Sequence, residues 1–219
     1  MVEKIKLITT DNVVILGDHY RSESANENPG ISLFHMMPST KESYKSLAEK
    51  LQQAGIGVVA IDLRGHGESE GGPDGYNNFT EEEHQKSIED LKTAIEYQKN
   101  EGHHPLFILG ASIGANLCLK FIAESDMVKK AILLSPGVNY MGIEAISLAK
   151  GVSSSKEIYI IAAKDDIREF GSADKEAEQI FDALSCKKKI KLFDTGGHGT
   201  DILVSNPEVV EELITWLGE

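Results

Sequence analysis

The stretch LFILGASIGANLCLKFIA at residues 106–123 contains the feature that decides the fold. Its apolar start at 106–109 is typical of a buried strand, and 115–123 is typical of a helix. Between them, Gly110-Ala111-Ser112-Ile113-Gly114 is a G-x-S-x-G pattern, in which small residues let a strand and a helix approach closely around a sharp turn. Such a turn projects the Ser112 hydroxyl at the partially positive start of a helix. The alternative is a glycine turn whose serine only caps the helix.

Apolar runs and helical patterns alternate on both sides of this stretch. Helices are predicted from Ser39, with Glu42 as capping-box partner, along 84–95, at 115–123, at 177–184, and after Asn206 as cap. We expect strands at 5–9, 13–16, 31–35, 58–61, 106–109, 131–134, 158–162 and 189–193. Two leading strands followed by strand–helix pairs predict a single α/β domain over residues 1–219, with a mostly parallel sheet of about eight strands and helices on both faces. In such sheets the functional site lies at the carboxyl ends of the strands.

The composition excludes several classes of partner. The chain has 22 Lys and Arg against 35 Asp and Glu, a formal net charge of −13. This balance argues against nucleic acid, because phosphate binding needs clustered basic residues. It also argues against an anionic membrane surface. The longest apolar runs are far shorter than a membrane-spanning helix needs.

Two cysteines, Cys118 and Cys186, stand outside any CxxC pair. With no signal-peptide pattern at the start of the sequence, they are expected to be reduced in a cytoplasmic protein. No cluster of acidic residues and histidines has metal-ligand spacing, so neither a metal nor a cofactor is expected.

A serine hydroxyl becomes a good nucleophile only when a base removes its proton, and that base is usually a histidine oriented by a carboxylate. His198 lies among glycines after the strand at 189–193, in a position typical of a loop. Asp165 and Asp166 follow the strand at 158–162. Because adjacent side chains point apart, only one of them is expected to reach His198. The chain order is then serine, aspartate and histidine.

With these motifs the sequence resembles the α/β-hydrolase family along nearly its whole length. The resemblance includes Gly110–Gly114, the Asp165-Asp166 turn, the Gly197-His198-Gly199 loop, and Asp62-Leu63-Arg64-Gly65-His66-Gly67-Glu68-Ser69 after the fourth strand. The compact plan is most similar to dienelactone-hydrolase-related proteins and small carboxylesterases. Dienelactone hydrolases use a cysteine nucleophile, so Ser112 favours the serine esterases.

The resemblance implies a catalytic triad of Ser112, Asp166 and His198. The family turn has the form Gly-x-x-Asp, with Ala163 here in the glycine position, which favours Asp166 over Asp165. The family's oxyanion hole, which stabilises the negative oxygen of the reaction intermediate, would use the amides of Ile113 and Met37. Family members often carry His-Gly-x-Gly where this chain has His35-Met36-Met37-Pro38.

The segment between the strands at 131–134 and 158–162 has room for a short helix at 140–149 but not for a cap domain. We therefore expect an open substrate pocket lined by Met36, Met37, Tyr140 and Met141, although Met36 and Met37 could instead be core residues. The expected function is a serine hydrolase for small neutral acyl esters. An amidase, peptidase or thioesterase with the same triad, and a ligand-binding homologue without catalysis, remain alternatives.

Overall fold

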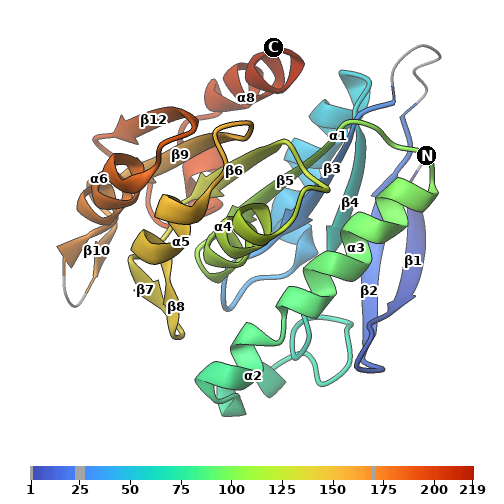
Figure 1. The fold of residues 1–219 in the computed structure, drawn as a ribbon. Helices are drawn as coiled ribbons and strands as arrows, with labels where there is room; N and C mark the ends of the chain where they lie inside the picture. Colours follow the sequence, from blue (N-terminus) through green and yellow to red (C-terminus); the bar gives the residue numbers. More distant parts are fainter. Residues whose placement is uncertain (1, 23–27, 169–170) are drawn as a thin grey trace.

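A computed structural model describes residues 2–22, 28–168 and 171–219, and its central element is one eight-stranded sheet (Figure 1). From one edge to the other the strands are β1 (Val2–Ile8), β2 (Val14–Tyr20), β4 (Gly57–Ile61), β3 (Gly30–Phe34), β5 (Leu106–Ala111), β6 (Lys130–Leu134), β9 (Glu157–Ala163) and β12 (Lys187–Phe193). Strand β2 is antiparallel to both of its neighbours, and the strands from β4 to β12 are parallel. The predicted α/β-hydrolase architecture is confirmed.

The register of the parallel strands brings their carboxyl ends to one edge. Phe34 lies opposite Gly110, and Ala111 lies opposite Leu134. On the far side, Ala163 lies opposite Phe193. The loops after β3, β5, β6, β9 and β12 therefore begin side by side, which is where the chemistry of such sheets is found.

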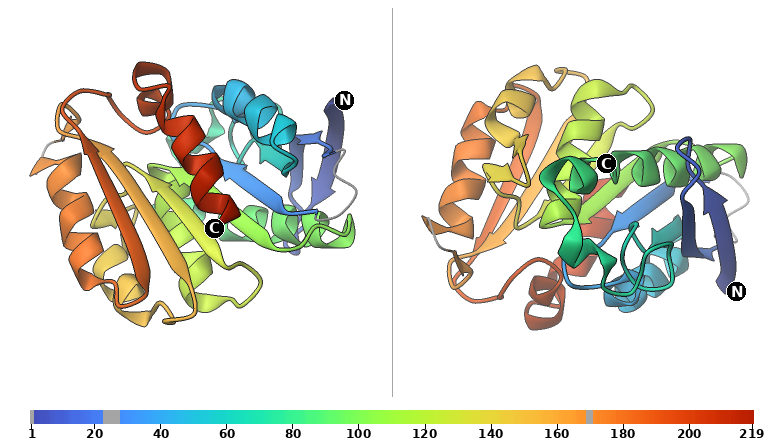
Figure 2. Two further views of the ribbon diagram at one scale, coloured as in Figure 1. Left: turned by 90° about the horizontal axis from the view of Figure 1, so that it is seen from above. Right: turned by 90° about the horizontal axis from the view of Figure 1, so that it is seen from below.

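Helices cover both faces of the sheet (Figure 2). Helices α1 (Lys45–Gln53) and α8 (Val209–Gly218) bury their apolar residues against one face. Helices α3 (Ile88–Asn100), α4 (Ile113–Glu124), α5 (Ala145–Gly151) and α6 (Ala173–Ala183) cover the other. Both faces of the central strands are thus buried, which explains why these strands read as continuous apolar runs rather than alternating ones.

The capping box predicted at Ser39 and Glu42 is wrong. The chain forms a 3₁₀ turn, Lys41–Tyr44, before α1, and no side chain of its own caps it. Instead, the backbone N–H of Lys41 donates to the Asp62 carboxylate at 2.8 Å, and the Lys41 ammonium lies 2.6 Å from the same group. A buried carboxylate from the loop after β4 has taken the place of a local cap, which a local sequence pattern cannot reveal.

Other helix boundaries also differ from the predictions. The helix predicted along 84–95 is two helices, α2 (Glu81–Gln85) and α3, and the capping box of this region joins Thr80 and Glu83. Asn206 does not cap the last helix: it ends α7 (Asp201–Ser205), and Glu208 precedes α8. The helix predicted at 140–149 begins only at Ala145.

Before Ala145 the chain forms a small hairpin of β7 (Asn139–Tyr140) and β8 (Ile143–Glu144). A second small hairpin, β10 (Ile167–Arg168) with β11 (Gly171–Ser172), follows β9. In the described part of the chain these short elements, and not a cap domain, stand above the carboxyl edge of the sheet.

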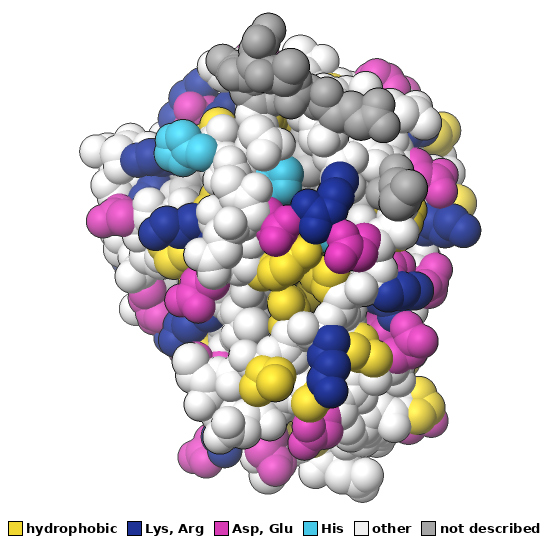
Figure 3. Space-filling view, turned by 90° about the vertical axis from the view of Figure 1, so that its right-hand side faces the viewer, with side chains coloured by type: hydrophobic (Ala, Val, Ile, Leu, Met, Phe, Trp, Pro, Cys, Tyr) yellow, Lys and Arg dark blue, Asp and Glu magenta, His cyan; other side chains and the backbone are white. Residues whose placement is uncertain are grey.

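Strand β1 forms an open edge of the sheet. Figure 3 shows this side of the molecule, where charged side chains of both signs surround a small group of hydrophobic ones. Lys4 pairs with Asp18 at 2.9 Å, and Arg21 pairs with Glu3 at 2.9 Å. Charged residues on an edge strand disfavour pairing with another sheet.

Candidate active site

Ser112 lies at the turn between β5 and α4 in a strained backbone conformation, with φ of 53° and ψ of −117°. Its neighbours allow no side chain. A Cβ atom on Gly110 would lie 2.2 Å from the Gly114 carbonyl oxygen, and one on Gly114 would lie 2.2 Å from the Phe34 carbonyl oxygen. The glycines of the G-x-S-x-G pattern thus let the start of α4 press against the end of β3. Strain of this kind, outside glycine, is typical of functional sites.

The Ser112 side chain itself is buried. Its residue is 1% exposed, and within the described part of the chain its hydroxyl has no hydrogen-bond partner. The backbone N–H of Ser112 donates to the Leu134 carbonyl at 2.9 Å, which ties the turn to the end of β6. The hydroxyl therefore does not serve as a helix cap in this structure.

Asp166 and His198 are joined directly. The Nδ1 atom of His198 lies 2.7 Å from the Asp166 carboxylate, and the same oxygen lies 3.2 Å from the Arg168 guanidinium. Burial opposes ionisation of Asp166, but the hydrogen bond with His198 and the charge of Arg168 outweigh it and hold the pKa of Asp166 below its usual value. Asp166 is therefore an ionised carboxylate at neutral pH, placed to fix the orientation of the imidazole.

Asp165 binds backbone groups of the loop that carries His198. Its exposed carboxylate accepts hydrogen bonds from the backbone N–H groups of Gly196 and Gly197, both at 3.0 Å. It thereby shapes the loop that carries His198 without contacting the ring. The two adjacent carboxylates point apart, so the structure brings Asp166, and not Asp165, to His198.

The loop that carries His198 packs against the turn that carries Ser112. The Gly199 N–H donates to the Ser135 hydroxyl at 2.9 Å, just after β6. A Cβ atom on Gly199 would lie 3.3 Å from the Ala111 side chain and 2.5 Å from the Met36 sulfur, so this position with φ of 58° requires glycine. Ser112 follows Ala111 directly, which places the two loops side by side.

The loop after β3 carries the predicted oxyanion group of Met37. Buried His35 anchors it, since its Nδ1 lies 2.9 Å from the Met36 carbonyl and its Nε2 accepts from the Leu63 N–H at 2.9 Å. Burial lowers the pKa of His35 to about 4, so the ring is neutral and can make both contacts at pH 7. Among the described residues, no acceptor takes the backbone N–H of Met37 or Ile113.

A pocket of about 500 Å³ adjoins this loop. Met37 and Met141 line it, together with Pro38, Tyr76, Asn77, Phe79, Glu81 and His84. Sequence reasoning predicted Met141 here but missed Tyr76 and Phe79, for which the one available signal was a pair of aromatic residues within a polar, glycine-rich loop.

Met36 and Tyr140, also predicted as pocket residues, do not line this 500 Å³ pocket. Met36 packs beneath the His198 loop, where the Thr200 hydroxyl lies 3.8 Å from its sulfur. Tyr140 is half-buried and packs against the hydrophobic core, beside Gly137. Arg168, which shares the Asp166 carboxylate with His198, was also missed, because its position depends on the short β10–β11 hairpin.

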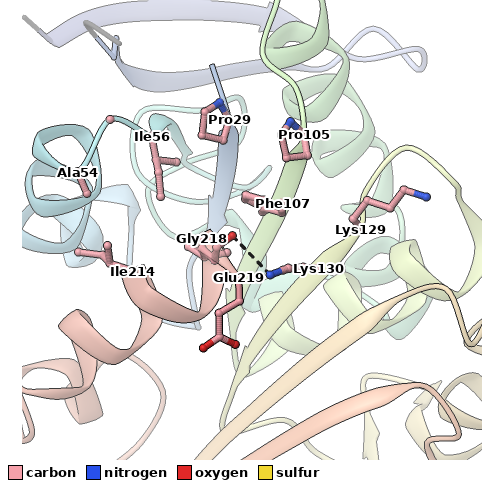
Figure 4. A pocket seen from close by; sticks show the side chains of 12 residues that line it. Pro29, Ala54, Ile56, Pro105, Phe107, Lys129, Lys130, Ile214, Gly218 and Glu219 are labelled. Carbon is pink, nitrogen blue, oxygen red and sulfur yellow. Dashed lines mark hydrogen bonds between the residues drawn. The ribbon is translucent and has the colours of Figure 1, made fainter. Parts of the chain in front are cut away.

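A larger cavity of about 570 Å³ lies at the opposite, amino end of the central strands (Figure 4). Its walls include Phe107, Lys130 and Ile214. The Lys130 ammonium donates to the carbonyls of Trp216 at 2.7 Å and Leu217 at 3.5 Å, and these hydrogen bonds hold it at the end of α8. None of the predicted site residues lines this cavity.

Two further observations concern the described residues only. They contain no group of three His, Cys, Asp or Glu side chains placed to hold a metal ion. Within the same ranges, none of the helices has the length and apolar character required to cross a bilayer.

A parallel sheet with a serine on a strained strand-to-helix turn, and a histidine–aspartate pair on the loops beside it, defines an α/β hydrolase. The chain belongs to the family described as serine aminopeptidase, S33, which matches residues 27–156, more than half of the sequence. No curated protein matches the sequence significantly.

Solved structures with the same fold include esterases. The esterase Pf2001 of Pyrococcus furiosus superposes with a TM-score of 0.80 at 18% identity, covering 100% of this chain and 92% of that one. A dienelactone hydrolase from Anabaena variabilis gives 0.77 at 16% identity, covering 99% and 94%. A thermostable carboxyl esterase from Bacillus coagulans gives 0.77 at 13% identity, covering 99% and 98%. At these identities the similarity establishes the fold, and together with the family it supports hydrolase activity.

Proposed function

We propose that the protein is a serine hydrolase that cleaves ester bonds of small neutral acyl substrates through a triad of Ser112, His198 and Asp166. The observation that carries the proposal is the 2.7 Å contact between His198 and Asp166, on a loop packed against the turn that holds Ser112. A carboxylate on Nδ1 leaves Nε2 as the basic nitrogen, which is the arrangement a serine nucleophile needs.

In the proposed reaction, the Ser112 hydroxyl attacks the acyl carbon while His198 Nε2 takes its proton. The alcohol leaves with the proton returned by His198, and an acyl-enzyme remains. Water, deprotonated by His198, then releases the acid and restores the serine. Asp166 stabilises the transient imidazolium, whose positive charge it faces directly. In unliganded enzymes the contact between nucleophile and base is commonly longer than in substrate complexes, so the unpartnered Ser112 hydroxyl fits a site that tightens when substrate binds.

The oxyanion of the intermediate would be held by the backbone N–H groups of Met37 and Ile113. Ile113 is the first residue of α4, where N–H groups have no partner within the helix and the helix dipole is positive. The contact between Gly114 and the end of β3 brings this helix start beside the loop that carries Met37. Removing one such donor from a hydrolase typically lowers kcat by about 10²- to 10³-fold.

We further propose that the protein acts in the cytoplasm on a small-molecule acyl substrate. Cys118 and Cys186 are buried and free of disulfide bonds, which supports a reducing compartment. The acidic net charge of −13 disfavours anionic substrates through long-range repulsion.

The bond specificity is tested with matched chromogenic substrates. We expect p-nitrophenyl butyrate to be hydrolysed with a kcat/KM at least about 10³-fold above that of the p-nitroanilide of the same acid, because p-nitrophenolate leaves as a stable anion, whereas the anilide nitrogen has to be protonated by His198 as its bond breaks. Steady-state rates and a thioester of the same acid complete the comparison. Preferential cleavage of the anilide, or of aminoacyl anilides, would replace the esterase proposal with a peptidase.

A further inference from the structure

The turn of the β7–β8 hairpin carries a methionine where glycine or asparagine is normally found. Met141 and Gly142 are its two central residues, with φ of 49° and 73°. A two-residue hairpin loop with positive φ at both positions favours Asn-Gly or Gly-Gly, since other side chains are strained there. The backbone of Met141 is therefore strained. Strained residues outside glycine are often found at functional sites, so Met141 is a candidate for a role beyond forming the turn.

Helix α2 holds this strained turn in place. The Gln85 side-chain amide donates to the Met141 carbonyl at 2.8 Å. A Cβ atom on Gly142 would lie 2.6 Å from the same amide nitrogen, so the two elements approach as closely as a glycine allows. This contact joins the hairpin to α2, although the two residues are 56 positions apart in the sequence.

Met141 is one of the residues that line the 500 Å³ pocket. Two other lining residues are held by ring contacts: Tyr76 stacks on the buried His66 ring at a centroid distance of 4.1 Å, and Phe79 packs edge-on against His84 at 5.4 Å. Burial lowers the pKa of His84, which keeps that ring uncharged at neutral pH. The lining is thus mostly apolar and aromatic, and its polar groups are the Asn77 amide, the uncharged His84 ring and the Glu81 carboxylate.

The pocket is tied to the elements that flank Ser112. Met37, on its wall, carries one of the proposed oxyanion donors. On the other side, the Asn116 side chain in the first turn of α4 binds the Gly137 N–H at 2.9 Å and the Gly137 carbonyl at 2.7 Å. Gly137 leads directly into the hairpin, so Asn116 fixes Met141 relative to the start of α4.

We infer that Met141 is a specificity-determining residue that closes a subsite for the acyl chain, and that the substrates are uncharged esters of medium-chain fatty acids. The inference rests on the proposed esterase function and assigns a subsite to the same reaction. A straight apolar chain fits walls of methionine and aromatic carbon. The Glu81 carboxylate repels a chain that ends in a negative charge.

The test measures kcat/KM for p-nitrophenyl acetate, butyrate, hexanoate and octanoate. For the wild-type protein we expect a rise of up to about fourfold for each methylene that enters the subsite. Met141→Asn removes the apolar wall while suiting positive φ, so it should flatten this rise without lowering the thermal midpoint of unfolding. Met141→Leu should keep the rise. Met127→Asn is the matched control, because Met127 packs half-buried at the amino end of the sheet before β6, and it should leave the rise unchanged.

The outcomes separate the two proposals. A wild-type protein that hydrolyses acetate through Ser112 but gains nothing from longer chains overturns the subsite and leaves the esterase intact. An unchanged rise in Met141→Asn likewise overturns the role of Met141. If none of the esters is hydrolysed and a fluorophosphonate probe does not label Ser112, both proposals fall.

Discussion

Ser112→Ala is expected to lower kcat for ester hydrolysis by about 10⁵- to 10⁶-fold. In the proposed mechanism the Ser112 hydroxyl forms the acyl-enzyme, and alanine has no hydroxyl to take its place. The variant should fold as the wild type does, because alanine keeps the Cβ atom and therefore the same strain at φ of 53°. Steady-state hydrolysis of p-nitrophenyl butyrate, with circular dichroism as the check on folding, measures the effect.

Ser112→Gly extends the same experiment to the energetics of the turn. Glycine relieves the strain of positive φ, so this equally inactive variant should gain roughly 1–2 kcal/mol in the free energy of unfolding relative to Ser112→Ala. Urea denaturation gives the difference. Retained turnover in either variant would remove Ser112 from the mechanism, and a less stable glycine variant would contradict the assigned strain.

Asp166→Asn is expected to lower kcat by about 10⁴-fold with little change in KM. An amide in place of the carboxylate no longer fixes the tautomer with a free Nε2, and it leaves the imidazolium of the transition state without its counter-charge. Kinetics with the same ester at several pH values measure the loss, which should persist across the neutral range because the lowered pKa of Asp166 keeps the native group ionised there.

The neighbouring residue provides a matched control. Asp165→Asn makes the same replacement of a carboxylate by an amide at the adjacent residue. Asp165, however, binds the N–H groups of Gly196 and Gly197 and not the His198 ring. Its loss should cost about 1 kcal/mol in the free energy of unfolding and leave kcat within tenfold of the wild type. The reverse pattern, with Asp165→Asn inactive and Asp166→Asn active, would contradict the assigned pair.

Sequence patterns predicted the strands of the sheet because β3, β4, β5, β6 and β9 are buried on both faces and read as continuous apolar runs between turn residues. The Ser112 turn could equally be predicted from the sequence, since the close approach of Gly110 and Gly114 to backbone atoms restricts those positions to glycine. The places of these residues after two strands of one parallel sheet predicted a contact between His198 and either Asp165 or Asp166, and the resemblance to the family's Gly-x-x-Asp turn selected Asp166. The catalytic roles of these residues stay predictions until they are tested.

Features set by distant parts of the chain escaped prediction. The start of the first helix is capped by Asp62, 21 residues away from Lys41, so no local pattern at Ser39 could identify it. The aromatic wall of Tyr76 depends on stacking against His66 in an irregular loop, and the position of Met141 depends on Gln85 of another helix. Irregular loops follow long-range contacts more than local propensity, and the 500 Å³ pocket is built largely from them.

The central claim is that Ser112 is a nucleophile activated by His198 and Asp166. Its most direct measurement is treatment of the folded protein with a fluorophosphonate probe, followed by peptide mass spectrometry. The account predicts a single stoichiometric adduct on Ser112, formed at a rate that falls at least 10³-fold in His198→Ala. A wild-type Ser112 that remains unmodified, or that reacts equally fast without His198, would contradict it.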